Sequence, residues 1–215
     1  NITYYNNKSI RNMENNFNKK GGMSKNTLII IAVVVVAVLW GVSAYNGMVS
    51  VEEQATTEWA KVQSAYQRRA DLIPNLVEVV KGYASHEKQT LEDVVNARAK
   101  ATSINVNAEN LSPEQLQQFQ AAQGELSQAL GRLIAVSEAY PDLKANENFR
   151  DLQVQLEGTE NRINEARNSF NTAVQNYNVK IRRFPNSLLA GIFGFDKMTK
   201  FEADAAAQKA PEVKF

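Results

Sequence analysis

The sequence predicts an all-α protein, in which an N-terminal transmembrane helix continues into an antiparallel up-and-down bundle of three to four long helices. One apolar run is long enough to cross a bilayer. In the rest of the chain apolar residues recur at three- and four-residue spacing, and prolines fall at the ends of these stretches. No segment alternates between apolar and polar residues as a half-buried strand would, so helices packing on helices are expected.

The apolar run covers residues 28–45, LIIIAVVVVAVLWGVSAY, and carries no charge. A helix rises ~1.5 Å per residue, so this run and one residue on each side cross a hydrocarbon core of ~30 Å. A cleaved secretory signal is the alternative, with small residues at 43–44. The run is longer than a usual signal core, and its aromatic residues suit a membrane interface, so we expect a retained anchor. The expected anchor residues are Leu28, Val35, Trp40 and Tyr45.

Charges flanking the run predict its orientation. Residues 1–27 carry five bases against the single acid Glu14, whereas Glu52, Glu53 and Glu58 follow the run before any base does. The positive-inside rule keeps the basic end in the cytoplasm. We therefore expect a single-pass protein of the bacterial inner membrane whose domain lies outside the cytoplasm, in the periplasm of a Gram-negative cell. The chain has no cysteine and thus neither disulfides nor a thiol catalyst.

Composition divides the chain into four parts. Residues 1–26 form an Asn- and Lys-rich segment that we expect to be disordered. It is an upstream extension if translation of the usual protein starts at Met23. Residues 27–46 are the transmembrane helix, and residues 47–184 are the helical bundle. Residues 185–215 form an apolar C-terminal segment expected to pack on the bundle or on a neighbour.

Four amphipathic stretches follow one another in the bundle. The first continues the membrane helix to about Leu72, where Pro74 interrupts it, either as a kink or as a tight reversal with Asp71 capping a new helix. The second stretch runs from residue 76 to about 102, with Tyr83 on its apolar face. Ser112 then caps a helix with proline in its first position, and this helix runs to about residue 140. The last covers residues 149–181 and ends before Pro185.

Two clusters are candidates for interaction. A polar group surrounds the proline: Arg68, Arg69, Asp71, Pro74 and Asn75. It satisfies the backbone groups that the proline frees, which we favour, or it forms a docking surface. An apolar group follows Pro185: Leu189, Ile192, Phe193 and Phe195. It folds back over a seam of the bundle, or it contacts lipid or a second subunit.

The chain offers no catalytic constellation, metal site or cofactor motif. His86 is the only histidine and there is no cysteine, so a zinc site lacks ligands. Nucleotide-binding loops and nucleophile elbows are absent from the sequence. The part of the chain after the apolar run is slightly acidic, which disfavours nucleic acid as a partner. We therefore expect no enzyme, no cofactor and no metal.

Several long blocks resemble the LemA family, in the family's order: YNGMV, RRADLIPNLVEVVKGYASHEKQT, LGRLIAVSEAYPDLKANENF, NSFNTAVQNYNVKIRRFPNSLLAGIFGF and APEVKF. The resemblance implies a membrane anchor and an antiparallel helical bundle, but no settled biochemical activity. It also implies a short N-terminus outside the cell, which puts the domain in the cytoplasm, and many members carry bases just after the span. This chain has VSVEEQ there, so we keep the orientation that its charges predict.

Function is expected at a membrane surface. The leading hypothesis is a non-enzymatic scaffold that self-associates, with the lipid bilayer and further copies of itself as partners. The alternative is a monomeric adaptor or regulator that docks another membrane protein, such as a protease or a signalling enzyme, through the polar group around Pro74.

Overall fold

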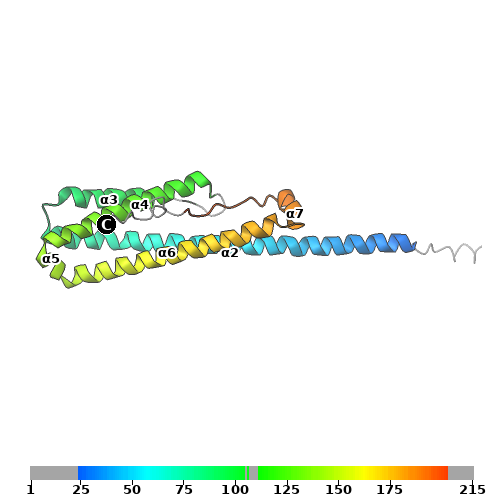
Figure 1. The fold of residues 1–215 in the computed structure, drawn as a ribbon, viewed down its shortest axis with the longest axis horizontal. Coiled ribbons are helices and arrows are strands. Elements are labelled where there is room, and N and C mark those ends of the chain that lie inside the picture. The colour runs from blue at the N-terminus through cyan, green and yellow to red at the C-terminus, as the bar shows by residue number, and fades with distance from the viewer. Residues whose placement is uncertain (1–23, 105, 107–110, 203–215) are drawn as a thin grey trace, which may run out of the picture. The chain divides into compact units, whose positions relative to one another are not determined.

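The computed structural model describes residues 24–104, 106 and 111–202. Helices occupy most of them, and these ranges contain no strand, which confirms the all-α prediction (Figure 1). In chain order the elements are α2 (Lys25–Tyr83), α3 (Lys88–Ser103), α4 (Pro113–Val136), the 3-10 turn η2 (Ser137–Ala139), α5 (Pro141–Ala145), α6 (Glu147–Arg182) and α7 (Asn186–Phe193). Residues 1–23 of the predicted N-terminal segment and the last thirteen residues, with a short helix expected at 203–209, lie outside the described residues, whereas Lys25 and Asn26 of that segment already belong to α2.

The chain forms two compact units, residues 1–44 and 45–215. Of the first, the structure describes the N-terminal part of α2. Its apolar side chains are exposed, among them Leu28 (51%), Val35 (50%) and Trp40 (41%). Within the described residues, α2 is the one helix long and apolar enough to cross a membrane.

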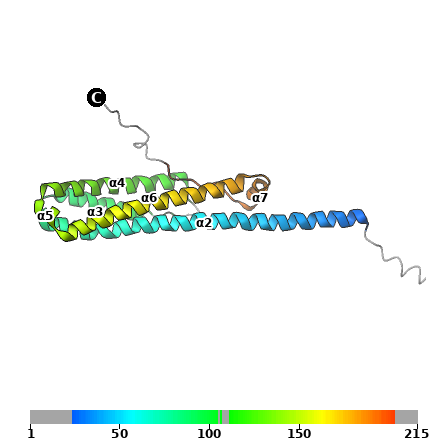
Figure 2. The ribbon, with the colours of Figure 1, turned by 60° about the horizontal axis from the view of Figure 1, so that its bottom comes forward.

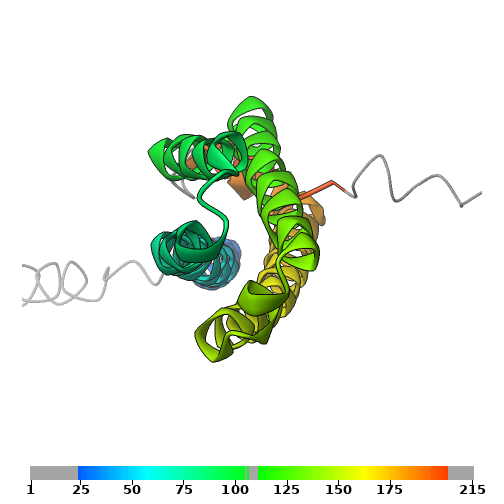
Figure 3. The ribbon, with the colours of Figure 1, turned by 90° about the vertical axis from the view of Figure 1, so that its left-hand side faces the viewer.

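The second unit is an antiparallel arrangement of the later part of α2 with α3, α4 and α6. Consecutive long helices run in opposite directions (Figures 1 and 2), and the view along their axes shows them side by side (Figure 3). Residues spaced three and four apart on each helix meet inside. The apolar residues at this spacing are mostly buried, as Trp59, Leu126 and Phe170 are, but Tyr83, which was expected on an apolar face, is 46% exposed. The pattern of the sequence thus predicted the packed faces of the helices.

Helix α2 does not end at Pro74. It runs through the proline to Tyr83, and the chain reverses at residues 84–87 instead. The expectation of a tight reversal at Pro74, with Asp71 capping a new helix, is therefore wrong. Asp71 is an interior helical residue whose carboxylate accepts a hydrogen bond from Gln67. The predicted second stretch accordingly divides, its first part completing α2 and the remainder forming α3.

The other helix ends follow their caps. Ser112 caps α4 in a capping box with Gln115, and Pro113 takes the first turn, as predicted. Asn146 caps α6 by accepting a hydrogen bond from the backbone N–H of Phe149. Two short elements, η2 and α5, separate α4 from α6, and α4 ends at Val136 rather than at about residue 140 as predicted. Helix α7 ends at Gly194, whose φ of 76° suits glycine.

Candidate functional site

Arg69 is the most deeply buried charged group in the described part of the chain, with 1% of its surface exposed. It belongs to α2 and reaches α4 and α6. Its Nη1 donates to Ser127 Oγ and to Glu160 Oε1, each at 2.7 Å. Its Nη2 donates to the backbone and side-chain oxygens of Gln123, at 3.2 and 2.6 Å. One guanidinium thus ties three helices together.

The surroundings of Arg69 fit a structural role. The guanidinium carbon lies 5.1 Å from the centre of the Tyr66 ring. Burial raises the pKa of the Tyr66 phenol, an effect that the positive charges of Arg167 and Arg69 partly offset. The tyrosine therefore stays neutral. The positive charge of Arg69 meets the carboxylate of Glu160, which is itself partly exposed.

The polar group around Pro74 does not form one surface. Arg68, Asp71, Pro74 and Asn75 are exposed on α2, but Arg69 points into the bundle. The expectation that Arg69 could lie on a docking surface with the others is therefore wrong. The five residues do not share one face of α2, because successive residues of a helix, such as Arg68 and Arg69, project about 100° apart.

The backbone carbonyl that Pro74 frees belongs to Ala70, four residues earlier. Its partner is Arg98 of α3, whose Nε donates to Ala70 O at 2.7 Å. The sequence interpretation assigned this role to the cluster around the proline. No local signal connects residues 70 and 98, because the contact exists only once α3 packs beside α2.

The apolar group after Pro185 also divides. Leu189 and Phe195 are partly buried and pack on the cluster of Met48, Tyr177 and Ile181. Ile192 and Phe193 are 73% and 53% exposed. The expectation of packing on the bundle therefore holds for Leu189 and Phe195, whereas contact of Ile192 and Phe193 with lipid or a second subunit stays a prediction.

Two asparagines of α6 hold the segment that follows α7. The Asn178 side chain donates to the carbonyl of Met198 and accepts from its N–H, at 2.9 and 3.0 Å. Asn171 makes the same pair of bonds with Phe201, at 3.2 and 2.8 Å. The Phe201 ring is buried against Trp59 and Phe170, with centroid distances of 5.8 and 5.6 Å. The sequence interpretation missed this clamp, although two asparagines seven residues apart on one helix face are visible in the sequence.

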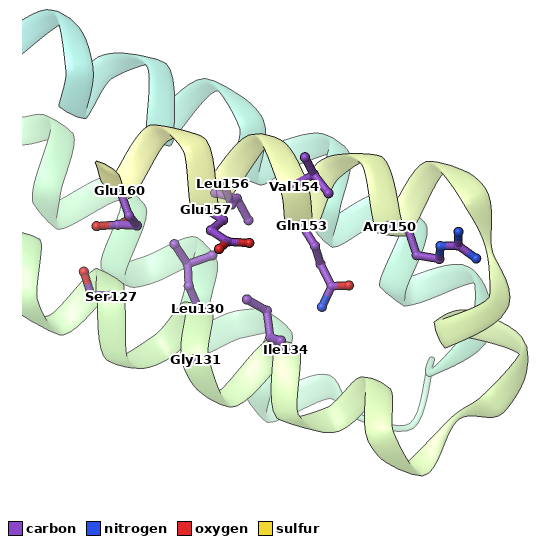
Figure 4. Close-up of a pocket in the computed structure, with 10 residues that line it drawn as sticks. All are labelled: Ser127, Leu130, Gly131, Ile134, Arg150, Gln153, Val154, Leu156, Glu157 and Glu160. Atoms are coloured by element: carbon purple, nitrogen blue, oxygen red, sulfur yellow. The ribbon is translucent and has the colours of Figure 1, made fainter. Parts of the chain in front are cut away.

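A groove of about 620 Å³ lies between α4 and α6. Its lining is mainly apolar, from Leu130, Ile134, Val154 and Leu156, and Gly131 opens its floor. Figure 4 shows Arg150 directed away from Leu130 and Ile134. The groove offers apolar contact area with polar groups along its edge.

Comparison with known proteins identifies the family. A family model described as the LemA family matches residues 58–215. The chain belongs to the LemA family. The resemblance seen in the sequence blocks is thereby confirmed, over nearly three quarters of the chain.

Individual relatives of this LemA family protein are more distant. It is 27% identical to magnetosome protein MamQ of Magnetospirillum gryphiswaldense over 179 residues, which are 75% of this chain and 66% of MamQ. Magnetosome protein MamQ 2 of Paramagnetospirillum magneticum matches to the same extent. Protein LemA of Metamycoplasma hominis is 22% identical over 196 residues, 89% of this chain and 86% of that protein. The chain thus spans just under two thirds of the MamQ proteins that it matches.

Proposed function

We propose that this LemA family protein is a membrane-anchored, non-enzymatic scaffold that self-associates at the membrane surface. The groove between α4 and α6 carries the proposal, because it is a mainly apolar surface of the bundle that is open to solvent. Val154 at its rim is 68% exposed. A second copy of the chain is the occupant that we propose for the groove.

The anchor favours a second copy over a soluble partner. Chains held by the apolar part of α2 would meet in two dimensions, so a modest apolar contact suffices to associate them. Small residues of the apolar run, Ala32, Ala37, Gly41 and Ala44, allow close approach of helices within lipid. The groove and the anchor would then act on the same assembly.

The interior of the bundle supports a non-enzymatic role. Enzymes that use a helical bundle direct titratable groups into a shared cavity. Here the buried Arg69 is engaged by Ser127, Gln123 and Glu160 of its own chain. Its hydrogen bonds join helices. The surface of the groove between α4 and α6 is mainly apolar, although Arg150, Glu157 and Glu160 contribute to its lining.

The first test is the native mass of the full-length protein in nanodiscs or mild detergent. We expect a defined homo-oligomer. Gly131→Arg fills the groove, yet a Cβ at Gly131 meets no atom within 4 Å, so the fold tolerates the change. Gly158→Arg is the matched control, since Gly158 is an exposed glycine of α6 with equally open space that does not line the groove.

Loss of the oligomer in Gly131→Arg, but not in Gly158→Arg, would support the groove as the contact. Equal masses for both variants and the wild type would assign assembly to another surface. A monomer in every preparation would overturn self-association and favour the adaptor hypothesis. The search would then turn to partners of the exposed surface of Arg68, Asp71 and Asn75.

A further inference from the structure

Helix α7, together with Phe184 just before it, exposes apolar side chains. The exposed fractions are 82% for Phe184, 61% for Leu188, 73% for Ile192 and 53% for Phe193. These four residues are called the α7 surface below. The other face of the helix is fixed to the bundle, because Ala190 is 5% exposed and packs with Ile181 and Tyr177. Helix α7 itself has no charged residue, so water solvates neither face well.

The α7 surface begins beside the residue that ends the apolar run. The Tyr45 ring contacts Phe193 edge-on, with a centroid distance of 5.0 Å, and Phe195 at 5.6 Å. Tyr45 is the last residue of that run in the sequence. A tyrosine in this position lies at the level of the lipid headgroups when the run crosses a bilayer. Its ring partners, Phe193 at the end of α7 and Phe195 just after it, are then within reach of the same level.

Basic residues flank the α7 surface along the chain. Between residues 180 and 200 the chain carries Lys180, Arg182, Arg183, Lys197 and Lys200 against the single acid Asp196. Arg182, Arg183 and Lys197 are exposed and form no ion pair within the described part of the chain. Lys180 lies close to the start of the bundle, since a Cβ at Gly47 would be 3.2 Å from its Nζ.

An apolar helix face flanked by bases is the pattern of an interfacial membrane helix. We infer that the α7 surface inserts into the headgroup region of the bilayer and that Arg182 and Arg183 bind anionic lipid headgroups. The inference rests on the proposed anchor. It goes further by giving the bundle a second attachment, more than 130 residues along the chain from the first, which restrains the bundle against the membrane.

The absence of cysteine from the chain allows a clean test. Single cysteines carrying an environment-sensitive fluorophore are introduced into the full-length protein, which is reconstituted in nanodiscs with spin-labelled lipids as quenchers. Ile192→Cys probes the α7 surface. Val95→Cys is the matched control, since it is an exposed aliphatic position of α3, which Figures 1 and 2 place at the other end of the bundle. Val35→Cys reports on the anchor.

Lipid quenching at position 192 is expected to exceed that at position 95 at least twofold. If position 35 is quenched but position 192 is quenched no more than the control at position 95, the inference is overturned and the anchor is left intact. No quenching at 35 overturns both. A third outcome is a blue-shifted emission at position 192 without lipid quenching. If this blue shift disappears when each disc holds a single chain, a second copy covers the α7 surface, and the inference is also overturned.

The lipid charge provides a second readout. Quenching at position 192 is expected to increase when phosphatidylglycerol replaces part of the phosphatidylcholine. Arg182→Gln with Arg183→Gln should abolish that increase. Arg132→Gln with Lys144→Gln removes two exposed bases from α4 and α5 and should preserve it. An increase that survives the first pair of changes overturns headgroup binding by these arginines.

Discussion

Arg98 Nε donates a 2.7 Å hydrogen bond to the backbone carbonyl of Ala70, the oxygen that a helical N–H at position 74 would have received. Pro74 has no N–H, so α2 would otherwise contain an unpaired carbonyl in its interior. The side chain comes from α3, beyond the reversal at residues 84–87. A neighbouring helix thus repairs the defect that a proline creates, and α2 continues to Tyr83.

Arg98→Met should lower the free energy of unfolding by about 1–3 kcal/mol, since a partly buried carbonyl loses its charged donor. Lys100→Met, two residues along α3, removes an exposed base paired with Glu125 and should cost less than about 0.5 kcal/mol. Urea unfolding followed by circular dichroism at 222 nm measures both. Equal effects of the two changes would show that the bond to Ala70 adds nothing.

The dependence on Pro74 can be measured as a coupling. In Pro74→Ala the backbone N–H returns and can bond to Ala70 O, so Arg98→Met should cost less in that background than in the wild type. A double-mutant cycle on the same unfolding curves gives the difference. Additive effects would contradict a role for Arg98 in replacing the missing donor.

Arg68 and Arg69 form a matched pair of adjacent arginines. Arg69→Ala should destabilise the protein by about 3 kcal/mol, because it removes a buried guanidinium that four oxygens accept from. Arg68→Ala, at an exposed position, should change stability by less than about 0.5 kcal/mol. Urea unfolding distinguishes them. A stable Arg69→Ala variant would mean that the three helices do not depend on this network.

Phe201→Ala should release the segment after α7 from the bundle. The ring is buried against Trp59 and stacks under Arg167, whose guanidinium carbon lies 4.7 Å from its centre. Removing it should cost about 3 kcal/mol. In a Trp40→Phe background, which leaves Trp59 as the single tryptophan, the emission should shift to the red and proteolysis near residue 200 should accelerate.

Phe184→Ala is the control for this change, since that phenylalanine is 82% exposed. It should leave both the Trp59 emission and the cleavage rate unchanged. The same emission maximum in Phe201→Ala as in the parent would contradict the packing of Phe201 on Trp59.

The raised pKa of the Tyr177 phenol predicts that the protein loses stability at alkaline pH. Burial, and next the negative charge of Glu52, raise the pKa of its phenol above the ordinary value of 10.0. Above about pH 10 the unfolded chain therefore loses this proton while the folded chain keeps it, and the free energy of unfolding falls as pH rises. Tyr177→Phe should show a shallower fall between pH 10 and 11 in urea unfolding. Identical slopes would exclude a contribution from this phenol.

Periodicity and caps in the sequence predicted the helices well, because burial of one face and satisfaction of end groups are local requirements. The spacing of Trp59, Leu126 and Phe170 predicted buried positions, and Ser112 predicted the start of α4. The course of α2 through Pro74 was not predictable locally, since it depends on Arg98.

The candidate site was harder to predict than the fold. The group around Pro74 is contiguous in sequence, but a helix distributes its members over different faces, so Arg69 is buried beside an exposed Arg68. The groove between α4 and α6 has no sequence signature, because it depends on how closely two helices approach. Whether the domain lies outside the cytoplasm stays a prediction from the flanking charges.

The two asparagines of α6 fix the number of residues in the segment that they bind. Asn171 and Asn178 are two turns apart, about 10.5 Å, and the three residue steps from Met198 to Phe201 can span this distance only when nearly extended. The side-chain amides of Asn171 and Asn178 bond to backbone groups and not to side chains. These bonds therefore place no requirement on the identity of residues 199 and 200. One residue inserted between them would move the second pair out of register by about 3.3 Å. Relatives should therefore vary in the letters of this stretch while conserving its number of residues.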